Sequence, residues 1–407
     1  MNKNPIRYLY VARACSVFSD QLLSYGIPLI VYQLRNSIVD SGLAFFFQTA
    51  ARLVALSVSG KLSDRLGAVR THEWADMSRL LGCVVCLVAG LLTDGHVLFW
   101  LLSILGGLIA FSNALAYVSL ETATGRIALK ESLAQTQAQF QMIDQSANLL
   151  GPLVAASLAL GIGKLGLLGV AALAFAVSFV CLRNICWVEN ERAEISYKPQ
   201  SQWSVLRHVF SYRPVLAFIG LSIVLNFGVG IYKSLLPAIV TSYYSEPESR
   251  IAWITALGGV MGILSMKFVG LFIDAKKTAV STGLTAFWIL IGLLAVSSYG
   301  PFTFFMIAAS LSVVCMAVFN VCQRTTRLQL LPKEMLGQSI GLIILVNQLS
   351  LPLAGLFVAG LSKVVTDQVT LFRVAMTATF LLGLAPSLLL LKKEVMALKW
   401  SGRPDSN

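Results

Sequence analysis

The feature that most limits the possible folds is a series of long apolar segments separated by short charged turns. Residues 43–59 contain one charged side chain, Arg52, and residues 80–93 contain none. Segments of roughly 20 apolar residues are long enough to cross a bilayer as helices. The chain of 407 residues is 12% charged, whereas a soluble domain is roughly 25% charged. Because the apolar runs are continuous rather than alternating, the sequence predicts an all-α polytopic membrane protein rather than strands.

Twelve of these segments are predicted to be transmembrane helices. They span about residues 8–33, 40–59, 71–93, 97–124, 131–160, 164–187, 214–243, 250–269, 278–299, 301–325, 334–362 and 368–391. One long polar stretch divides them into two sets of six. The expected organisation is therefore an N-terminal six-helix bundle at 1–189, a linker at 190–213, a C-terminal six-helix bundle at 214–391 and a tail at 392–407.

The distribution of Lys and Arg predicts the orientation in the membrane. Of the 31 basic residues, 24 fall in or beside the turns and tails on one side, five near the other side and two, Arg52 and Lys233, within helices. Basic residues accumulate on the cytoplasmic side of membrane proteins. We therefore expect a multi-pass protein of the inner or plasma membrane with both termini and the linker in the cytoplasm. The net charge of +12 lies in these turns, so the expected partner is the lipid bilayer and not nucleic acid.

Landmarks recur in the same order in the two predicted bundles. A proline lies 32 or 33 residues before a glycine, that glycine opens a Gly-x-x-x-Asp turn, and an arginine lies 25 or 26 residues before a later proline. The corresponding pairs are Pro28–Gly60 and Pro237–Gly270, Gly60–Asp64 and Gly270–Asp274, and Arg126–Pro152 and Arg327–Pro352. Such a parallel repeat predicts two bundles related by pseudo-twofold symmetry about the membrane normal.

The turn after the second predicted helix carries the most specific motif. It reads Gly60-x-Leu62-Ser63-Asp64-Arg65-x-Gly67, followed by Arg70. The glycines allow a tight reversal of the chain. A carboxylate among basic neighbours is suited to pair with an arginine and with a helix N-terminus.

This turn resembles the signature between helices 2 and 3 of the major facilitator superfamily, although Ala68 and Val69 precede Arg70 where that family usually has basic residues. The resemblance implies the major facilitator fold and a conformational latch on the cytoplasmic side. In that latch, the Asp64 carboxylate is expected near the start of the eleventh helix, around residues 337–339, with Gly270 and Asp274 as the repeat's counterpart. Asp76-x-x-Arg79, which we group with the latch, looks like the start of helix 3 in the drug, macrolide and siderophore exporter branch.

Two further motifs favour export. Ala147-x-x-x-Gly151-Pro152 in the fifth predicted helix resembles the antiporter motif of drug exporters, with alanine where that family prefers glycine. Asp20 and the run at 27–34 look like the first helix of the siderophore and macrolide exporter branch. Gly151, Pro152 and Pro352 are expected to allow helix kinks.

Charged residues at mid-membrane depth are candidates for function, because burying a charge in a bilayer is unfavourable. Asp20, Arg52 and Asp144 lie near the middle of their predicted helices. A carboxylate that alternates between an arginine-paired state and a protonated state can couple proton flow to a conformational change. We therefore expect Asp20 to face Arg52 and to exchange a proton, with a static ion pair as the alternative and Asp144 as the next candidate.

Other polar residues divide into two groups. An inner gate, or contacts with lipid headgroups, is expected from Glu121, Arg126, Arg324 and Arg327. Substrate binding is the candidate role of Asn113, Asn148, Asn226, Lys233, Asn347 and Gln348. The amides among these can instead join two helices, and Lys233 can instead extend outward to the membrane surface.

The sequence shows no nucleotide-binding loop and no catalytic constellation, so we expect neither an enzyme nor a cofactor. The histidines His72, His96 and His208 are scattered in or near turns and predict no metal site. The predicted function is proton-driven export of a small amphipathic molecule, a siderophore or a drug, by a monomer working through alternating access. Arg52 and Lys233 favour an anionic or zwitterionic substrate. The alternatives are a nutrient or metabolite importer, a ferroportin-like metal exporter, and a membrane sensor or partner-binding protein that does not transport.

Overall fold

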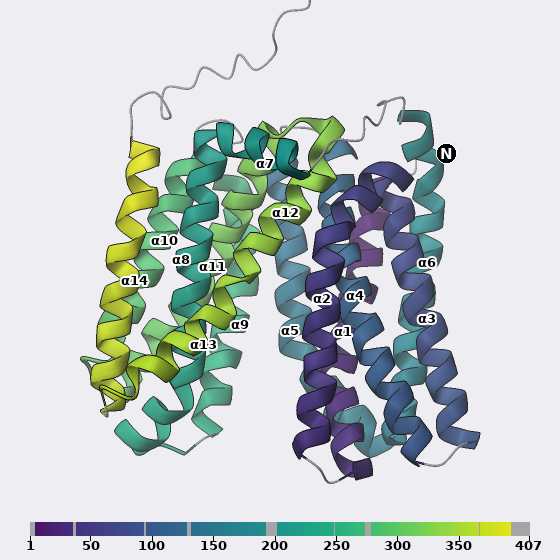
Figure 1. Cartoon of the computed structure of the whole chain (residues 1–407), viewed down its shortest axis with the longest axis horizontal. Coiled ribbons are helices and arrows are strands. Elements are labelled where there is room, and N and C mark those ends of the chain that lie inside the picture. Colours follow the sequence, from purple (N-terminus) through teal and green to yellow (C-terminus); the bar gives the residue numbers. More distant parts are fainter. Residues whose placement is uncertain are drawn as a thin grey trace, which may run out of the picture. The chain divides into compact units, whose positions relative to one another are not determined.

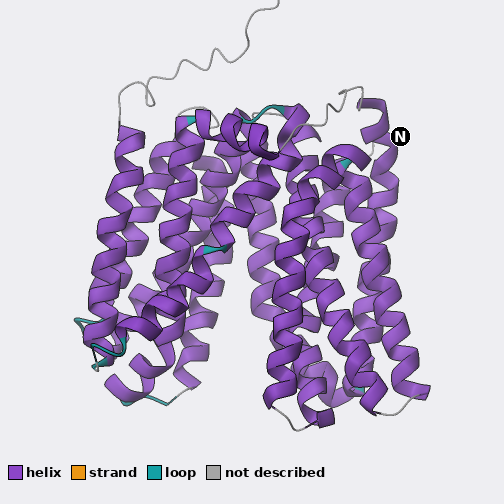
Figure 2. Ribbon diagram, in the orientation of Figure 1, coloured by secondary structure: helices purple, strands orange, loops and turns teal. Residues whose placement is uncertain are grey.

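The computed structural model describes residues 5–35, 38–92, 95–127, 132–192, 202–247, 249–272, 278–365 and 367–391. Within these ranges the chain is almost entirely helical and contains no strand (Figures 1 and 2). Each of the twelve predicted segments is helical, which confirms the fold class. Seven of the helices in the described ranges are long and apolar enough to cross a membrane.

The helices of the first half of the chain are α1 (Pro5–Arg35), α2 (Ile38–Leu66), α3 (Ala68–Leu92), α4 (Gly95–Ile127), α5 (Leu133–Gly161) and α6 (Gly163–Arg192). Those of the second half are α7 (Gln202–Ser211), α8 (Arg213–Ala238), α9 (Ser249–Phe272), α10 (Thr278–Ser297), α11 (Phe302–Leu330), α12 (Leu336–Gln348), α13 (Ser350–Leu361) and α14 (Gln368–Leu391). A π-helical turn, Ile239–Tyr243, extends α8, and a 3-10 turn, Lys333–Met335, precedes α12.

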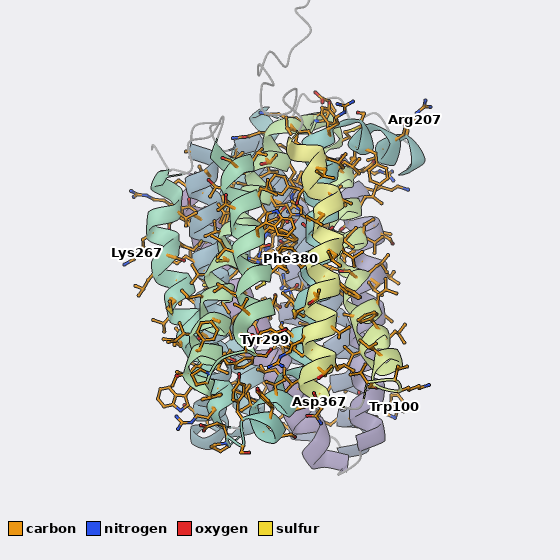
Figure 3. All side chains as sticks on the ribbon, turned by 90° about the vertical axis from the view of Figure 1, so that its left-hand side faces the viewer. Trp100, Arg207, Lys267, Tyr299, Asp367 and Phe380 are labelled. Atoms are coloured by element: carbon orange, nitrogen blue, oxygen red, sulfur yellow. The ribbon has the colours of Figure 1, made fainter. Side chains whose placement is uncertain are left out.

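Two elements differ from the sequence prediction. The stretch expected to be a linker contains a short helix, α7, which carries an exposed Arg207 that points away from the protein (Figure 3). The eleventh predicted segment is two helices, because α12 ends at Gln348 and α13 begins at Ser350. Proline has no backbone N–H and its ring clashes with the carbonyl four residues earlier. For Pro352 that residue is Gln348, so the break lies where the proline requires it, whereas α5 continues through Gly151 and Pro152.

Contacts divide the chain into two compact units. Unit 1 comprises Met1–Ala128, Ile143–Val205 and Leu331–Leu345, and unit 2 comprises Leu129–Met142, Leu206–Leu330 and Val346–Asn407. Unit 1 therefore includes most of α12, although α12 belongs to the second half of the sequence. The division of the sequence at residues 190–213 into two bundles stays a prediction.

The same helix pairs pack together within each half of the chain. In the first half, α1 packs against α4 and α6, and α3 packs against α4 and α6. In the second half, α8 packs against α11 and α14, and α10 packs against α11 and α14. The α2–α4 pair likewise corresponds to the α9–α11 pair. This equivalence is the structural form of the repeat seen in the sequence.

Each unit has its own apolar core. Leu102, Phe99 and Phe175 are central to a cluster in unit 1, and Phe218 and Phe287 to a larger one in unit 2.

Outside the cores, the first turn of α14 is capped by Asp367, which lies near one end of that helix in Figure 3. Its Oδ2 accepts a hydrogen bond from Thr370 N at 2.9 Å. Hydrogen bonds from the Thr370 side chain and backbone lower the pKa of the Asp367 carboxyl.

Candidate functional site

The centre of unit 1 contains a carboxylate held by two neighbouring helices. Asp20 of α1 is buried, and Arg79 Nη1 of α3 donates hydrogen bonds to its Oδ1 at 2.8 Å and Oδ2 at 2.7 Å. Asn113 Nδ2 of α4 donates to Asp20 Oδ2 at 2.6 Å. The partner of Asp20 is therefore Arg79, and the predicted pairing with Arg52 is wrong.

Arg79 also binds a second buried carboxylate. Its Nη2 donates to Asp76 Oδ1 at 2.5 Å, and its guanidinium lies 4.8 Å from the centre of the Phe175 ring. Asp76 accepts further hydrogen bonds from Ser16 Oγ at 3.1 Å and from Ser178 Oγ. We call Asp20, Asp76 and Arg79 the charged triad.

The triad corrects the grouping of Asp76 and Arg79 with the latch. Both side chains are fully buried inside unit 1 and contact α1 and α6. Arg79 lies four residues before Cys83 and seven before Cys86, so all three share one face of α3. Both cysteines are buried in the apolar core. The face of α3 that carries Asp76 and Arg79 therefore packs inside the helix bundle and does not belong to the turn between α2 and α3.

Arg52 occupies a different environment. It is exposed, although it lies three residues before Ala55 and four before Leu56, which are both buried. A helix of 3.6 residues per turn puts these three positions on one face. Arg52 interacts electrostatically with Asp20 and with Tyr117 of α4. It is thus close enough to influence the triad without being a member of it.

Asp144, the third charge predicted at mid-membrane depth, forms an ion pair with Arg13. Asp144 Oδ1 of α5 accepts a hydrogen bond from Arg13 Nε of α1 at 2.8 Å, and both side chains are nearly buried. Arg13 is one of the 24 basic residues assigned above to the turns and tails on the expected cytoplasmic side. Its guanidinium also lies 5.6 Å from the centre of the Tyr117 ring.

The predicted contact of Asp64 with the start of the eleventh segment is confirmed. Asp64 Oδ1 accepts a hydrogen bond from Gly337 N at 3.0 Å, and Oδ2 accepts one from Gln338 N at 2.8 Å. Both donors are backbone N–H groups of the first turn of α12, where the helix dipole favours an anion. Arg126 Nη2 of α4 donates to Asp64 Oδ1 at 2.9 Å, so a residue assigned to the inner gate belongs to this contact.

Glycines bring α2 and α12 unusually close at this contact. A Cβ atom added to Gly60 would lie 2.4 Å from Gly337 O and 2.5 Å from Gln338 Cα. A Cβ atom on Gly341 would be 3.2 Å from Gly60 N. No other residue type fits at Gly60 unless α12 moves. We call this contact between α2 and α12, with the Asp64 hydrogen bonds, the α2–α12 clasp.

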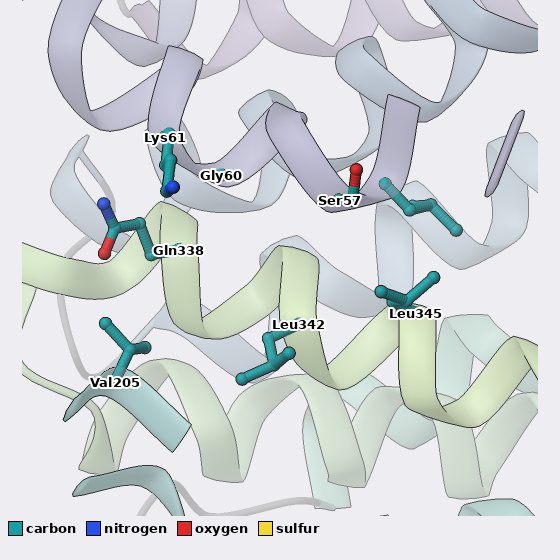
Figure 4. A pocket seen from close by; sticks show the side chains of 8 residues that line it. Ser57, Gly60, Lys61, Val205, Gln338, Leu342 and Leu345 are labelled. Carbon is teal, nitrogen blue, oxygen red and sulfur yellow. The ribbon is translucent and has the colours of Figure 1, made fainter. Parts of the chain in front are cut away.

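The rest of the turn motif shapes the chain around the clasp. Gly67 has a φ of 92° and separates α2 from α3, a conformation that favours glycine. Arg65 and Arg70 are exposed. Beside the clasp lies a groove bordered by α2, α7 and α12, with Ser57, Lys61 and Leu342 among its lining residues (Figure 4).

The remaining gate and kink candidates are placed as follows. Glu121 and Arg327 are buried, in α4 and α11 respectively, and Arg324 of α11 is half-buried. Gly151 allows close packing of α5 on α1, because a Cβ atom there would be 2.5 Å from Gln21 Cβ. The counterpart of the latch falls partly outside the described residues, because Gly270 lies in α9 but Asp274 is not described.

Two of the candidate substrate-binding amides, Asn113 and Asn226, form hydrogen bonds that join helices. Asn226 Nδ2 of α8 donates to the backbone oxygen of Asn347 in α12 at 3.2 Å. Asn113 holds Asp20, as described above. Asn148 and Lys233 are exposed, and Gln348 is half-buried at the end of α12.

Four residues around the triad were not identified from the sequence as site residues: Arg13, Ser16, His72 and Ser178. The serines are short polar residues within apolar runs and give no distinctive signal. His72 had a usable signal, because residues 72, 76, 79, 83 and 86 recur at helical spacing and would share one face of α3. All five are buried.

A polytopic helical fold with ion pairs buried between its helices is the architecture of a membrane transporter. The profile of the Major Facilitator Superfamily matches residues 9–355, and the chain belongs to that superfamily. It is therefore a multi-pass membrane transporter for a small-molecule substrate.

Solved structures of transporters share its fold. A bacterial homologue of the iron transporter ferroportin in an outward-facing state is 18% identical, with a TM-score of 0.74 over 95% of this chain and 100% of that chain. The same kind of homologue with soaked iron gives 18% identity and a TM-score of 0.74 over 98% and 99%. The human organic anion transporter MFSD10 (TETRAN) is 14% identical, with a TM-score of 0.69 over 95% and 99%. The sequence has no significant match among curated proteins.

Proposed function

We propose that this transporter exports a small amphipathic anion or zwitterion, of the siderophore or drug class, in exchange for protons across the inner membrane. The observation that carries the proposal is the environment of Asp20. A buried carboxylate at mid-helix depth is bound by Arg79 and Asn113. Protonation of such a carboxylate removes its attraction for the guanidinium, and so links a proton to helix packing.

The anionic character of the substrate is proposed from the basic residues that remain exposed. Arg52 in α2 and Lys233 in α8 are exposed although they lie in apolar helices. The organic anion transporter among the structures of similar fold agrees with this choice. The similarity to exporters at the Asp20, Asp76–Arg79 and Gly151–Pro152 motifs supports the outward direction.

A metal cation is the second candidate, because carboxylates bind metals and because the ferroportin homologue has the same fold. The hydrogen bonds of Asp20 argue against a metal cation at this site. Arg79 donates to both carboxylate oxygens, so a metal ion at Asp20 would have to displace a buried guanidinium. A cation is expected to avoid the site that an arginine already neutralises.

The experiment compares metabolites in the medium and the cytoplasm of a strain that lacks the gene with those of the same strain carrying the gene. An exported molecule accumulates inside the deletion strain, whereas the substrate of an importer stays in the medium. The Asp20→Asn variant should fail to restore export while it retains passive exchange in membrane vesicles. Normal proton-dependent export by Asp20→Asn would reject the coupling role, and accumulation of iron in place of an organic anion would favour the metal exporter.

A further inference from the structure

The buried charges of the triad do not balance. Asp20 and Asp76 share the one guanidinium of Arg79, and the three side chains are at most 5% exposed. With both carboxylates ionised, the triad carries one net negative charge. The nearby Arg13–Asp144 pair is neutral by itself, and Arg52 acts on Asp20 from an exposed position outside the triad. Because a net charge buried between apolar helices is strongly disfavoured, the triad favours the binding of one proton close by.

His72 lies where that proton can bind. Its Nε2 atom is 3.8 Å from Asp76 Oδ2, and the ring is 1% exposed. Neither ring nitrogen has a hydrogen-bond partner in the part of the chain that the structure describes. Burial disfavours the charged ring as well as a neutral imidazole without partners. Next to Asp76, however, an imidazolium gains a charged partner that the neutral ring lacks. Histidine is also the side chain whose charge changes most readily near neutral pH.

We propose that His72 and Asp76 form the site at which the transporter binds and releases its coupling proton, and that this proton controls how Arg79 divides its hydrogen bonds between Asp76 and Asp20. The proposal rests on the proton-coupled transport proposed above. It identifies His72, together with Asp76, as the site that binds the proton. Asp20 is then the carboxylate whose hydrogen bonds with Arg79 change when the proton binds.

The step consists of one proton transfer. A hydronium ion of the aqueous phase gives a proton to Nε2 of the neutral ring and is left as water. The ring becomes an imidazolium, and the triad together with His72 becomes neutral. The imidazolium and Arg79 then compete for the Asp76 carboxylate. As His72 pairs with Asp76, the guanidinium is released toward Asp20, which strengthens the tie between α1 and α3. Loss of the proton reverses the sequence.

The neighbouring groups act on this proton in opposite directions. Burial, and then repulsion by Arg79 and Arg13, disfavour a positive charge on His72, whereas Asp76, whose Oδ2 lies 3.8 Å from Nε2, attracts it. The titratable and charged side chains around the triad come from the helices packed against α3 and from α1: Arg13, Cys15 and Asp20 of α1, Arg52 of α2, Tyr117 of α4 and Cys181 of α6. Protonation therefore depends on whether Arg79 is bound mainly to Asp76 or to Asp20.

The test is a histidine titration by nuclear magnetic resonance on the full chain in detergent, without any substrate. The protein has three histidines, so ring-labelled histidine gives few signals, and His72→Gln identifies that of His72. We expect His72 to titrate, and Asp76→Asn to lower its proton affinity at least tenfold. Asp20→Asn should lower it by a smaller factor, because Arg79 then lacks its other carboxylate. Asp367→Asn, an exposed change of the same kind, should leave it unchanged.

Two results would overturn the proposal. One is a His72 signal that keeps a single protonation state in the unmodified protein between about pH 4.5 and 9.5, a range centred near the ordinary histidine pKa. This measurement needs no variant to fold. The other is a folded Asp76→Asn protein in which His72 titrates as it does in Asp367→Asn. The titration uses neither substrate nor a proton gradient, so it can succeed even if the transport experiment rejects proton-coupled export.

Discussion

Replacing Gly60 by alanine tests whether the α2–α12 clasp depends on backbone contact. The added Cβ atom would lie 2.4 Å from Gly337 O and 2.5 Å from Gln338 Cα, both rigid backbone atoms. Restoring ordinary contact requires α12 to move away by about 1 Å. Overpacking of this kind costs about 1–3 kcal/mol. The shift also stretches the hydrogen bonds from Gly337 N and Gln338 N to Asp64, now 3.0 and 2.8 Å long, and each such bond to a charge contributes about 1.5–3 kcal/mol.

We therefore expect Gly60→Ala to weaken the clasp by about 3 kcal/mol or more, which is about a hundredfold in population. The assay follows maleimide labelling of Ser339→Cys in a background without native cysteines, because Ser339 is fully buried beside the clasp. Labelling should become at least tenfold faster in Gly60→Ala. Gly292→Ala is the matched control, since a Cβ atom there meets nothing within 4 Å. Equal labelling rates in the two variants would refute the clasp argument.

Four other outcomes follow from the contacts described above. Asp64→Asn should accelerate the same labelling and reduce transport without loss of expression, because an amide cannot accept both backbone N–H groups as strongly as a carboxylate; unchanged labelling would contradict this. Arg79→Lys should lower the free energy of unfolding by about 1–3 kcal/mol, measured by thermal unfolding in detergent. The single ammonium group of lysine cannot replace the guanidinium, whose two Nη atoms bind two different carboxylates. Asn226→Ala should cost about 1 kcal/mol for one lost hydrogen bond, and a stability equal to that of the unmodified protein would show that the bond contributes nothing. Gly283→Ala should cost about 1–3 kcal/mol, since its Cβ atom would lie 2.8 Å from Phe218 Cε1, and a stabilised variant would contradict the close packing there.

The sequence was sufficient for the features that depend on local chemistry. The lengths of the apolar segments predicted the helices, because backbone groups inside a bilayer must be satisfied within the helix itself. Local chemistry also indicated that a carboxylate at the Gly60–Asp64 turn would pair with an arginine and a helix N-terminus. That this N-terminus belongs to the eleventh segment was implied by the resemblance to the superfamily motif.

Only the tertiary structure decided which buried charges pair. Asp20 binds Arg79 and not Arg52, and Asp144 binds Arg13. The rotation of each helix about its axis selects these partners. In a soluble protein an apolar stripe reveals that rotation. A membrane helix is apolar on the lipid side and on the packed side alike, so α1 and α2 carry little sequence signal for the direction in which each charge points.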